Sequence, residues 1–183
     1  MNRTLYSCTM SLDGFMAGPG GDMQWLRPHL RPDPVAQDLV PRIGALLVGN
    51  RTFHGDDPNR GTDHEGAFGG TWHGPAFVLT HWPPAEPPDD PDLTFVTDVE
   101  SGVAAARTAA GDRYVNVLGA EAARSCLEAG LLDEILVFVA PVLLGDGTRL
   151  FAWPGGHEVA LRARPVPDAD AAPHVAHLWY DVV

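Results

Sequence analysis

Residues 114–151, YVNVLGAEAARSCLEAGLLDEILVFVAPVLLGDGTRLF, constrain the fold of this chain more than any other stretch. Tyr114–Leu118 is a short apolar run of strand-favouring residues, and a glycine ends it. Glu121–Ala129 are strong helix formers, and Gly130 stands where a helix C-terminal glycine is expected. A second apolar run, Ile135–Leu144, follows. Strand, glycine turn, helix and strand in this order predict a βαβ unit, with parallel strands and a right-handed crossover.

The turn before the predicted helix, Gly119-Ala120-Glu121-Ala122, is where we expect chemistry. Backbone amides at a helix N-terminus point outward, carry partial positive charge and bind phosphate well. Many α/β domains contain such a turn without a ligand, so the turn alone does not define a function.

Three strings in this segment, VLGAE, AGLLDEI and PVLLGDGTRLF, closely resemble the reductase domain at the C-terminal end of the bifunctional riboflavin-biosynthesis deaminase-reductase. The last string, Pro141–Phe151, is the most specific of the three. That domain, the RibD C-terminal domain, is part of the dihydrofolate-reductase-like group, which uses NADPH. The resemblance covers nearly the whole chain, and it is clearest from Ser11 to Phe151. It implies a homodimeric NADPH-dependent reductase that passes hydride to a C=N or C=O bond of a pterin- or pyrimidine-like heterocycle.

Further apolar runs predict the remaining strands, and cap and periodicity signals predict two more helices. Strands alternating with helices indicate an α/β domain with a mostly parallel central sheet flanked by helices, closed by a C-terminal antiparallel hairpin. The resemblance specifies this as the three-layer α/β/α dihydrofolate-reductase-like fold, with ligands at the C-terminal edge of the parallel strands. The predicted strands are Leu5–Met10, Ala45–Val48, Ala76–Thr80, Leu93–Thr97, Glu158–Arg164 and His174–Val183; the helices run from Asp33 to about Ile43, and from Asp98 or Ser101 to about Ala110.

Length and charge narrow the class of protein. At 183 residues the chain suits one domain, residues 1–183, that buries about 70% of its unfolded surface. A formal charge of −12 argues against nucleic acid or an anionic membrane as a partner, because phosphate backbones need a basic face. No apolar run reaches transmembrane length, and residues 1–10 lack a signal-peptide pattern. We therefore expect a cytoplasmic protein with a small-molecule substrate.

The string Gly49-Asn50-Arg51-Thr52 resembles the group's second signature, a glycine, two mostly basic positions and a threonine at a helix start. The resemblance implies that Thr52 caps the helix and touches the cofactor pyrophosphate, while a basic side chain reaches the 2′-phosphate of NADPH. Asn50 replaces the first basic residue and only Arg51 is positive, so discrimination between NADPH and NADH is expected to be modest. An ordinary strand-turn-helix without a ligand is the alternative.

Two further cofactor positions depart from the group's pattern. Thr80-His81 lies where a threonine or serine with an arginine often meets the adenosine phosphate, and His81 could do so only when protonated. Ala120 stands where a second glycine is usual, and its methyl group could crowd the pyrophosphate. Together with Asn50, these departures favour a second hypothesis, a non-catalytic protein that binds a small ligand on the same fold.

The substrate side is less defined. Residues 17–24, AGPGGDMQ, read as a mobile surface loop or, by the resemblance, as a lid over the site. Asp33 before Pro34 is typical of a helix cap. The resemblance implies instead that Asp33 is the catalytic carboxylate that contacts the substrate, with Asp38 and Asp13 as competitors. The expected substrate-binding residues are Asp13, Trp25 and Phe53.

The loop 54–74 is rich in Gly, Asp and His, but its spacing matches no recognised metal-ligand pattern. We therefore expect a solvated loop and no metal. Phe68 and Trp72 within it could wall a substrate pocket.

Overall fold

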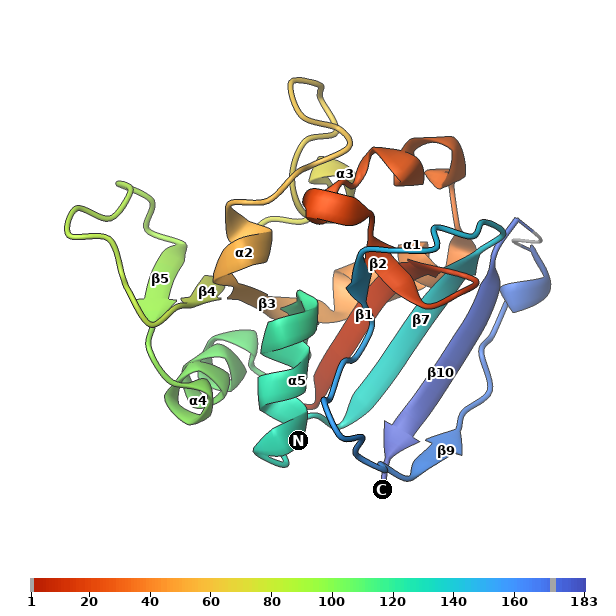
Figure 1. The fold of residues 1–183 in the computed structure, drawn as a ribbon. Coiled ribbons are helices and arrows are strands. Elements are labelled where there is room, and N and C mark those ends of the chain that lie inside the picture. Colours follow the sequence, from red (N-terminus) through yellow and green to blue (C-terminus); the bar gives the residue numbers. More distant parts are fainter. Residues whose placement is uncertain (1, 172–173) are drawn as a thin grey trace.

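An eight-stranded sheet forms the centre of the molecule in the order β5-β4-β3-β6-β1-β7-β10-β9 (Figure 1). The structure is a computed structural model that describes residues 2–171 and 174–183. The strands from β5 to β7 run parallel, β10 is antiparallel to β7, and β9 is antiparallel to β10. The strands are β1 (Thr4–Ser11), β3 (Ile43–Gly49), β4 (Ala76–Leu79), β5 (Leu93–Val96), β6 (Tyr114–Leu118), β7 (Glu134–Ala140), β9 (Leu161–Ala163) and β10 (Ala176–Val182).

Helices cover both faces of this sheet, and a second, two-stranded sheet stands apart from it. This small sheet pairs β2 (Phe15–Ala17) antiparallel with β8 (Thr148–Arg149). Figure 1 shows α4 and α5 on one face of the sheet and α1 on the other. The helices are α1 (Pro34–Leu39), α2 (Asn50–Phe53), α3 (Ala67–Gly70), α4 (Val99–Ala110) and α5 (Ala120–Glu128), with 3₁₀ turns at Pro19–Gly21, Gln24–His29, Val40–Arg42 and Ala169–Ala171. This arrangement confirms the predicted three-layer architecture with a mostly parallel sheet. It also confirms the C-terminal antiparallel hairpin, which β9 and β10 form.

The protein has one hydrophobic core on each face of the sheet, and alternate residues of β3 point into one core or the other. Ala45 and Leu47 point to the face that α4 and α5 cover, and Leu46 and Val48 point to the face that α1 covers. All four side chains are buried, and each fully buried Leu contributes roughly 1.5–3 kcal/mol. Gly44 lets the helix layer come close, because a Cβ there would lie 2.7 Å from Ala110 Cα at the end of α4.

The β6–α5–β7 unit forms as predicted, with one difference in pairing. Strands β6 and β7 are parallel, but β1 lies between them and pairs with both. The two strands are therefore parallel as predicted, but they are not adjacent in the sheet. The strand predicted to reach Leu144 ends at Ala140, because Pro141 has no N–H to continue a ladder. Leu143, beyond this end, is 68% exposed.

The N-terminal edge of the sheet is closed by a buried ion cluster. Glu134 is fully buried, and its carboxylate lies 3.0 Å from Arg3 and 2.9 Å from Arg164. The Trp179 indole N–H donates to Glu134 at 2.7 Å. Because burying an unpaired carboxylate is costly, these partners offset the cost of placing Glu134 inside the fold.

None of the helices within residues 2–171 and 174–183 combines the length and the apolar character needed to cross a membrane.

Candidate active site

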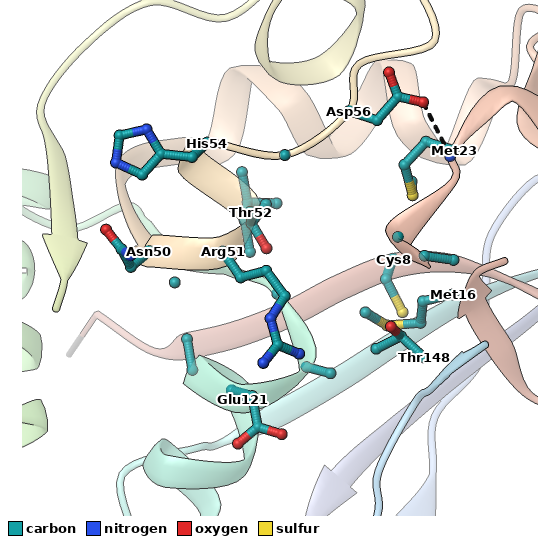
Figure 2. Close-up of a pocket in the computed structure, with 18 of the residues that line it drawn as sticks. Cys8, Met16, Met23, Asn50, Arg51, Thr52, His54, Asp56, Glu121 and Thr148 are labelled. Atoms are coloured by element: carbon teal, nitrogen blue, oxygen red, sulfur yellow. Dashed lines mark hydrogen bonds between the residues drawn. The ribbon is translucent and has the colours of Figure 1, made fainter. Parts of the chain in front are cut away.

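A large cleft runs along the C-terminal edge of the parallel strands, from the end of β5 to the end of β1. Its volume is about 1760 Å³. Open parallel sheets bind ligands at this edge because the strand ends and helix starts present unpaired backbone groups there. Figure 2 places Arg51, Thr52 and Glu121 in the middle of the cleft, with Cys8, Met16 and Thr148 to one side.

Two glycine turns meet at the centre of the cleft. Gly119 precedes α5 with φ +102, and a Cβ built on it would overlap the Thr52 hydroxyl of α2. A Cβ on Gly49 would lie 3.4 Å from the Ala122 methyl group. The turns after β3 and β6 therefore pack directly on each other. Only glycine at position 119 allows both this contact and the left-handed backbone.

All ten residues predicted to hold a cofactor line this cleft. They come from the turns that follow β3, β4 and β6, and the structure brings them together: Gly49, Asn50, Arg51, Thr52, Thr80, His81, Gly119, Ala120, Glu121 and Ala122. One detail of the prediction is wrong, because the N-cap of α2 is Gly49 and Thr52 lies inside the helix.

The side chains of these residues differ in whether they already form ion pairs or hydrogen bonds within the chain. Arg51 points into the cleft toward the start of α5 (Figure 2), and it has no ion pair among the described residues. Thr80 is buried, and its hydroxyl accepts a hydrogen bond from the Trp82 amide at 3.2 Å. His81 is exposed, and Trp82 beside it lines the cleft and is 87% exposed. Glu121 pairs with Arg124 at 2.7 Å on the wall formed by α5.

The predicted lid borders the cleft and is held on two sides. Asp56 accepts a hydrogen bond from the Gln24 side chain at 2.8 Å. It also accepts one from the Met23 amide at 3.1 Å (Figure 2). These bonds lower the pKa of Asp56, and the bond from the Gln24 side chain has the largest effect. On the other side, a Cβ on Gly147 would overlap the Ala17 carbonyl, so the backbone before β8 lies directly against the lid.

The structure places Asp33 outside the cleft lining. It is the N-cap of α1, and its Oδ1 accepts from the amides of Val35 and Ala36 at 2.9 and 3.1 Å. Its Oδ2 lies 2.8 Å from His177 Nε2. The geometry therefore supports the cap interpretation, and the substrate role of Asp33 stays a prediction. Asp38, its competitor, lies on an exposed face of α1 in an ion pair with Arg42.

The three predicted substrate-binding residues do not line the cleft either. Phe53 packs edge-on against Phe95 of β5, at 5.8 Å between ring centroids. The indole nitrogen of Trp25 is buried without a partner among the described residues. Asp13 accepts hydrogen bonds from Ser11 Oγ at 2.6 Å and from the amides of Leu144 and Gly145 at 3.1 and 2.7 Å.

Those bonds explain the acidity of Asp13. The hydrogen bond from the Ser11 hydroxyl has the largest effect, and together with the two amides it lowers the pKa of Asp13 to about 2. The carboxylate thereby ties the turn after β1 to the loop that leads toward β8.

Apart from the lid, the residues at the β1 side of the cleft were not predicted from the sequence. Cys8 and Thr9 lie near the end of β1, and the general rule for parallel strands could have pointed to them. Burial raises the pKa of the Cys8 thiol to about 12, so it stays protonated at neutral pH. Asp56 and Arg60 come from the loop after α2 and Asp146 comes from the turn before β8, and their position depends on contacts that no local pattern indicates.

No group of three or more metal-ligating side chains is assembled within the part of the chain that the structure describes.

The fold and the cleft define an α/β domain of the dihydrofolate-reductase-like class. The RibD C-terminal domain family matches residues 4–166. The chain therefore belongs to the RibD C-terminal domain family. No curated protein sequence matches it significantly.

Solved structures share this fold at low identity. A protein from Shewanella sp. PV-4 assigned to riboflavin biosynthesis has 20% identity and a TM-score of 0.73, with 99% of each chain covered. The riboflavin biosynthesis reductase Rib7 of Saccharomyces cerevisiae has 14% identity and a TM-score of 0.62, covering 100% of this chain and 90% of Rib7. The Thermotoga maritima deaminase/5-amino-6-(5-phosphoribosylamino)uracil reductase has 17% identity and a TM-score of 0.57. There 99% of this chain aligns with 56% of the longer protein.

Proposed function

We propose that this protein is an NADPH-dependent reductase that transfers hydride to a C=N or C=O bond of a small pterin- or pyrimidine-like heterocycle. The observation that carries the proposal is the assembly of ten predicted cofactor residues, from three separate turns, on one cleft. Membership of the RibD C-terminal domain family and the reductase names of two fold neighbours, Rib7 and the Thermotoga maritima protein, agree with it.

The residues present fit a dinucleotide. The cleft exceeds the roughly 300–1,000 Å³ of typical small-molecule pockets, which leaves space for a cofactor and a second ligand. The amides at the start of α5 would donate to the cofactor phosphates, and the missing Cβ of Gly119 lets the Thr52 hydroxyl lie beside them. Arg51 would supply the cation, and the exposed indole of Trp82 offers a flat surface for a stacked base.

The chain's own residues would bind, orient and shield the reactants. NADPH, when bound, supplies the hydride. The lid, held by Asp56, would exclude water from the β1 side of the cleft. Among the residues that line this side, the carboxylates and Thr148 could exchange hydrogen bonds with a substrate, whereas Cys8 remains an uncharged thiol.

A cofactor titration tests the proposal. NADPH added to the full chain should quench tryptophan fluorescence with a dissociation constant at or below roughly 10–100 μM, or about −5 to −7 kcal/mol. The Trp82→Phe variant should lose most of that quench, because the other four tryptophans do not line the cleft. No fluorescence change and no calorimetric heat up to millimolar NADPH or NADH would contradict the proposal.

The second hypothesis, a non-catalytic ligand-binding protein, predicts the same binding without turnover. Oxidation of NADPH followed at 340 nm with a panel of pterins and aminopyrimidines separates the two. The departures from the family's pattern at Asn50, His81 and Ala120, which all line the cleft, are the observations that favour this alternative.

We also propose a homodimer. Strand β7 cannot pair with a second copy edge to edge, since β1 and β10 occupy both of its edges. Leu12 and Leu143 are 66% and 68% exposed on adjacent loops, and the Leu12 amide donates to Val142 at 2.8 Å. Sedimentation at micromolar concentration should give a dimer that Leu143→Glu dissociates. A wild-type monomer would contradict this proposal.

A further inference from the structure

The cleft has two unlike ends. Its β1 end is formed by the end of β1, the lid, the loop after α2 and the turn before β8. Its other end is formed by the turns after β4 and β5, and it includes Trp82 and Asp98. Strands β3 and β6 stand between β4 and β1 in the sheet, so the glycine turns separate the two ends. The β1 end comprises Cys8, Thr9, Met16–Met23, Leu26, Gly55, Asp56, Arg60, Asp146, Gly147 and Thr148.

Carboxylates dominate the β1 end. Asp22 is part of the lid, and Asp56 holds the lid through Met23 and Gln24. Asp146 precedes Gly147, whose backbone lies against the lid. All three aspartates are exposed to solvent and line the same cleft. The β1 end therefore presents three negative charges.

Positive charge at this end is scarce. The chain contains no lysine, so all 12 of its basic residues other than histidine are arginines. Within residues 2–171 and 174–183, Arg60 is the arginine that lines the β1 end, and its guanidinium donates to the Gly55 carbonyl. Arg124 on the α5 wall is occupied by Glu121 at 2.7 Å, with Glu128 at 3.9 Å. Arg51 lies at the glycine turns, where the proposed cofactor phosphates would use it.

We propose that the β1 end binds an unphosphorylated heterocycle, neutral or cationic, whose N–H groups donate to these aspartates. The proposal rests on the proposed function, which places the cofactor at the glycine turns and leaves the β1 end for the substrate. A phosphate dianion needs cations or converging amides, and three aspartates against one arginine repel it. Ring amino groups instead find acceptors there. Met16, Met23 and Leu26 add apolar surface for a ring face.

Matched pairs of ligands that differ only in a phosphate group test the proposal. Binding is measured by calorimetry to the full chain saturated with NADP⁺, so that no ligand is turned over. The pairs are 5-amino-6-ribosylaminouracil with its 5′-phosphate, and neopterin with its monophosphate. At least one unphosphorylated member should bind about tenfold or more tightly than its partner. The preference should shrink as ionic strength rises, because the cleft is open to solvent.

Charge-neutral variants locate the effect. The triple variant Asp22→Asn, Asp56→Asn, Asp146→Asn keeps the side-chain shapes and should bring the affinities of each pair together. The control is Glu86→Gln, Asp89→Asn, Asp90→Asn on the exposed connector after β4, outside the cleft. It changes the net charge by the same amount and should leave the preference intact.

Each outcome is decisive. Tighter binding of the phosphorylated members, or no binding of any unphosphorylated member to a chain that binds NADP⁺, would overturn the proposal. An equal change in both triple variants would do the same, since the preference would then reflect overall charge. Failure to bind NADP⁺ counts against the proposed function instead, and the comparison repeated without cofactor still decides the charge preference.

Discussion

His177 Nε2 lies 2.8 Å from Asp33 Oδ2, and this contact joins the last strand to the residue that caps α1. The His177 side chain is 1% exposed, and its Nδ1 has no hydrogen-bond partner within the described part of the chain. Because Asp33 Oδ1 accepts from two amides of α1, both oxygens of the carboxylate are engaged. The pair is a buried tie between β10 and α1.

Removing the contact between Asp33 and His177 should destabilise the fold. Asp33→Asn keeps the cap oxygen but replaces a charged acceptor opposite His177 with an amide. Urea denaturation should show a loss of roughly 1.5–3 kcal/mol, the range for a hydrogen bond to a charged group. His177→Phe should remove most of the same coupling, so the double variant should be less destabilised than the sum of the two.

The same variant tests the substrate role implied by the resemblance. Since Asp33 does not line the cleft, turnover per folded molecule and NADPH affinity should both be retained in Asp33→Asn. A collapse of turnover at unchanged NADPH affinity would show that Asp33 contacts the substrate after all.

Gly119→Ala should damage the cleft more than an ordinary glycine substitution. An alanine there meets both the left-handed backbone, at φ +102, and the Thr52 hydroxyl. The control is Gly130→Ala, where φ is +67 and no atom lies within 4 Å, so only backbone strain of about 1–2 kcal/mol is expected. We expect Gly119→Ala to lose more stability than this control and to weaken NADPH binding about tenfold or more. Equal losses of stability, with NADPH affinity intact, would contradict the proposed cofactor position.

Asn50→Arg addresses cofactor choice. The new guanidinium should raise NADPH affinity by about tenfold, the equivalent of one charge-assisted hydrogen bond, and leave NADH affinity nearly unchanged. Calorimetric titration of both cofactors measures the difference. Equal changes for the two would mean that position 50 does not face the 2′-phosphate.

Asp13 gives a pH-dependent prediction. Its folded pKa of about 2 is below the ordinary value, so the stabilisation from its hydrogen bonds is present above the unfolded pKa of about 4. It is lost as the pH falls through the folded pKa. Asp13→Asn should therefore melt at a lower temperature than wild type at pH 7, and the gap should narrow between pH 4 and pH 2. A gap that stayed constant over this range would refute the assignment.

Much of the fold could be predicted because its signals are local. Tyr114–Leu118 is the observed β6, and the limits of α5 differ from the prediction by one residue at each end. The glycines that bracket this helix act within a few residues of it. The place of β1 between β6 and β7 could not be predicted, since it depends on pairing Leu5 with Asn116 and with Glu134. No periodicity in either segment encodes that neighbour.

The candidate site likewise has one part that could be predicted from local sequence and one part that could not. Its cofactor side consists of short contiguous strings, such as Gly49–Thr52, which a motif can identify. Its β1 end is assembled from four separate segments, and its character comes from charges such as Asp56 and Asp146 that no motif contains. Asp33 has the local pattern of a helix cap, and it is one. The partner that completes its hydrogen bonding, His177, lies 144 residues away along the chain.

The central place of β1 has a consequence for how the chain folds during synthesis. The strand made first has both of its sheet neighbours in the last 70 or so residues, so it stays unpaired until more than half of the chain has emerged. Closing such long loops makes folding slow relative to a chain with local contacts. An amino-terminal fragment that ends before Tyr114 lacks both neighbours of β1, so both edges of this strand are open to pairing with wrong partners.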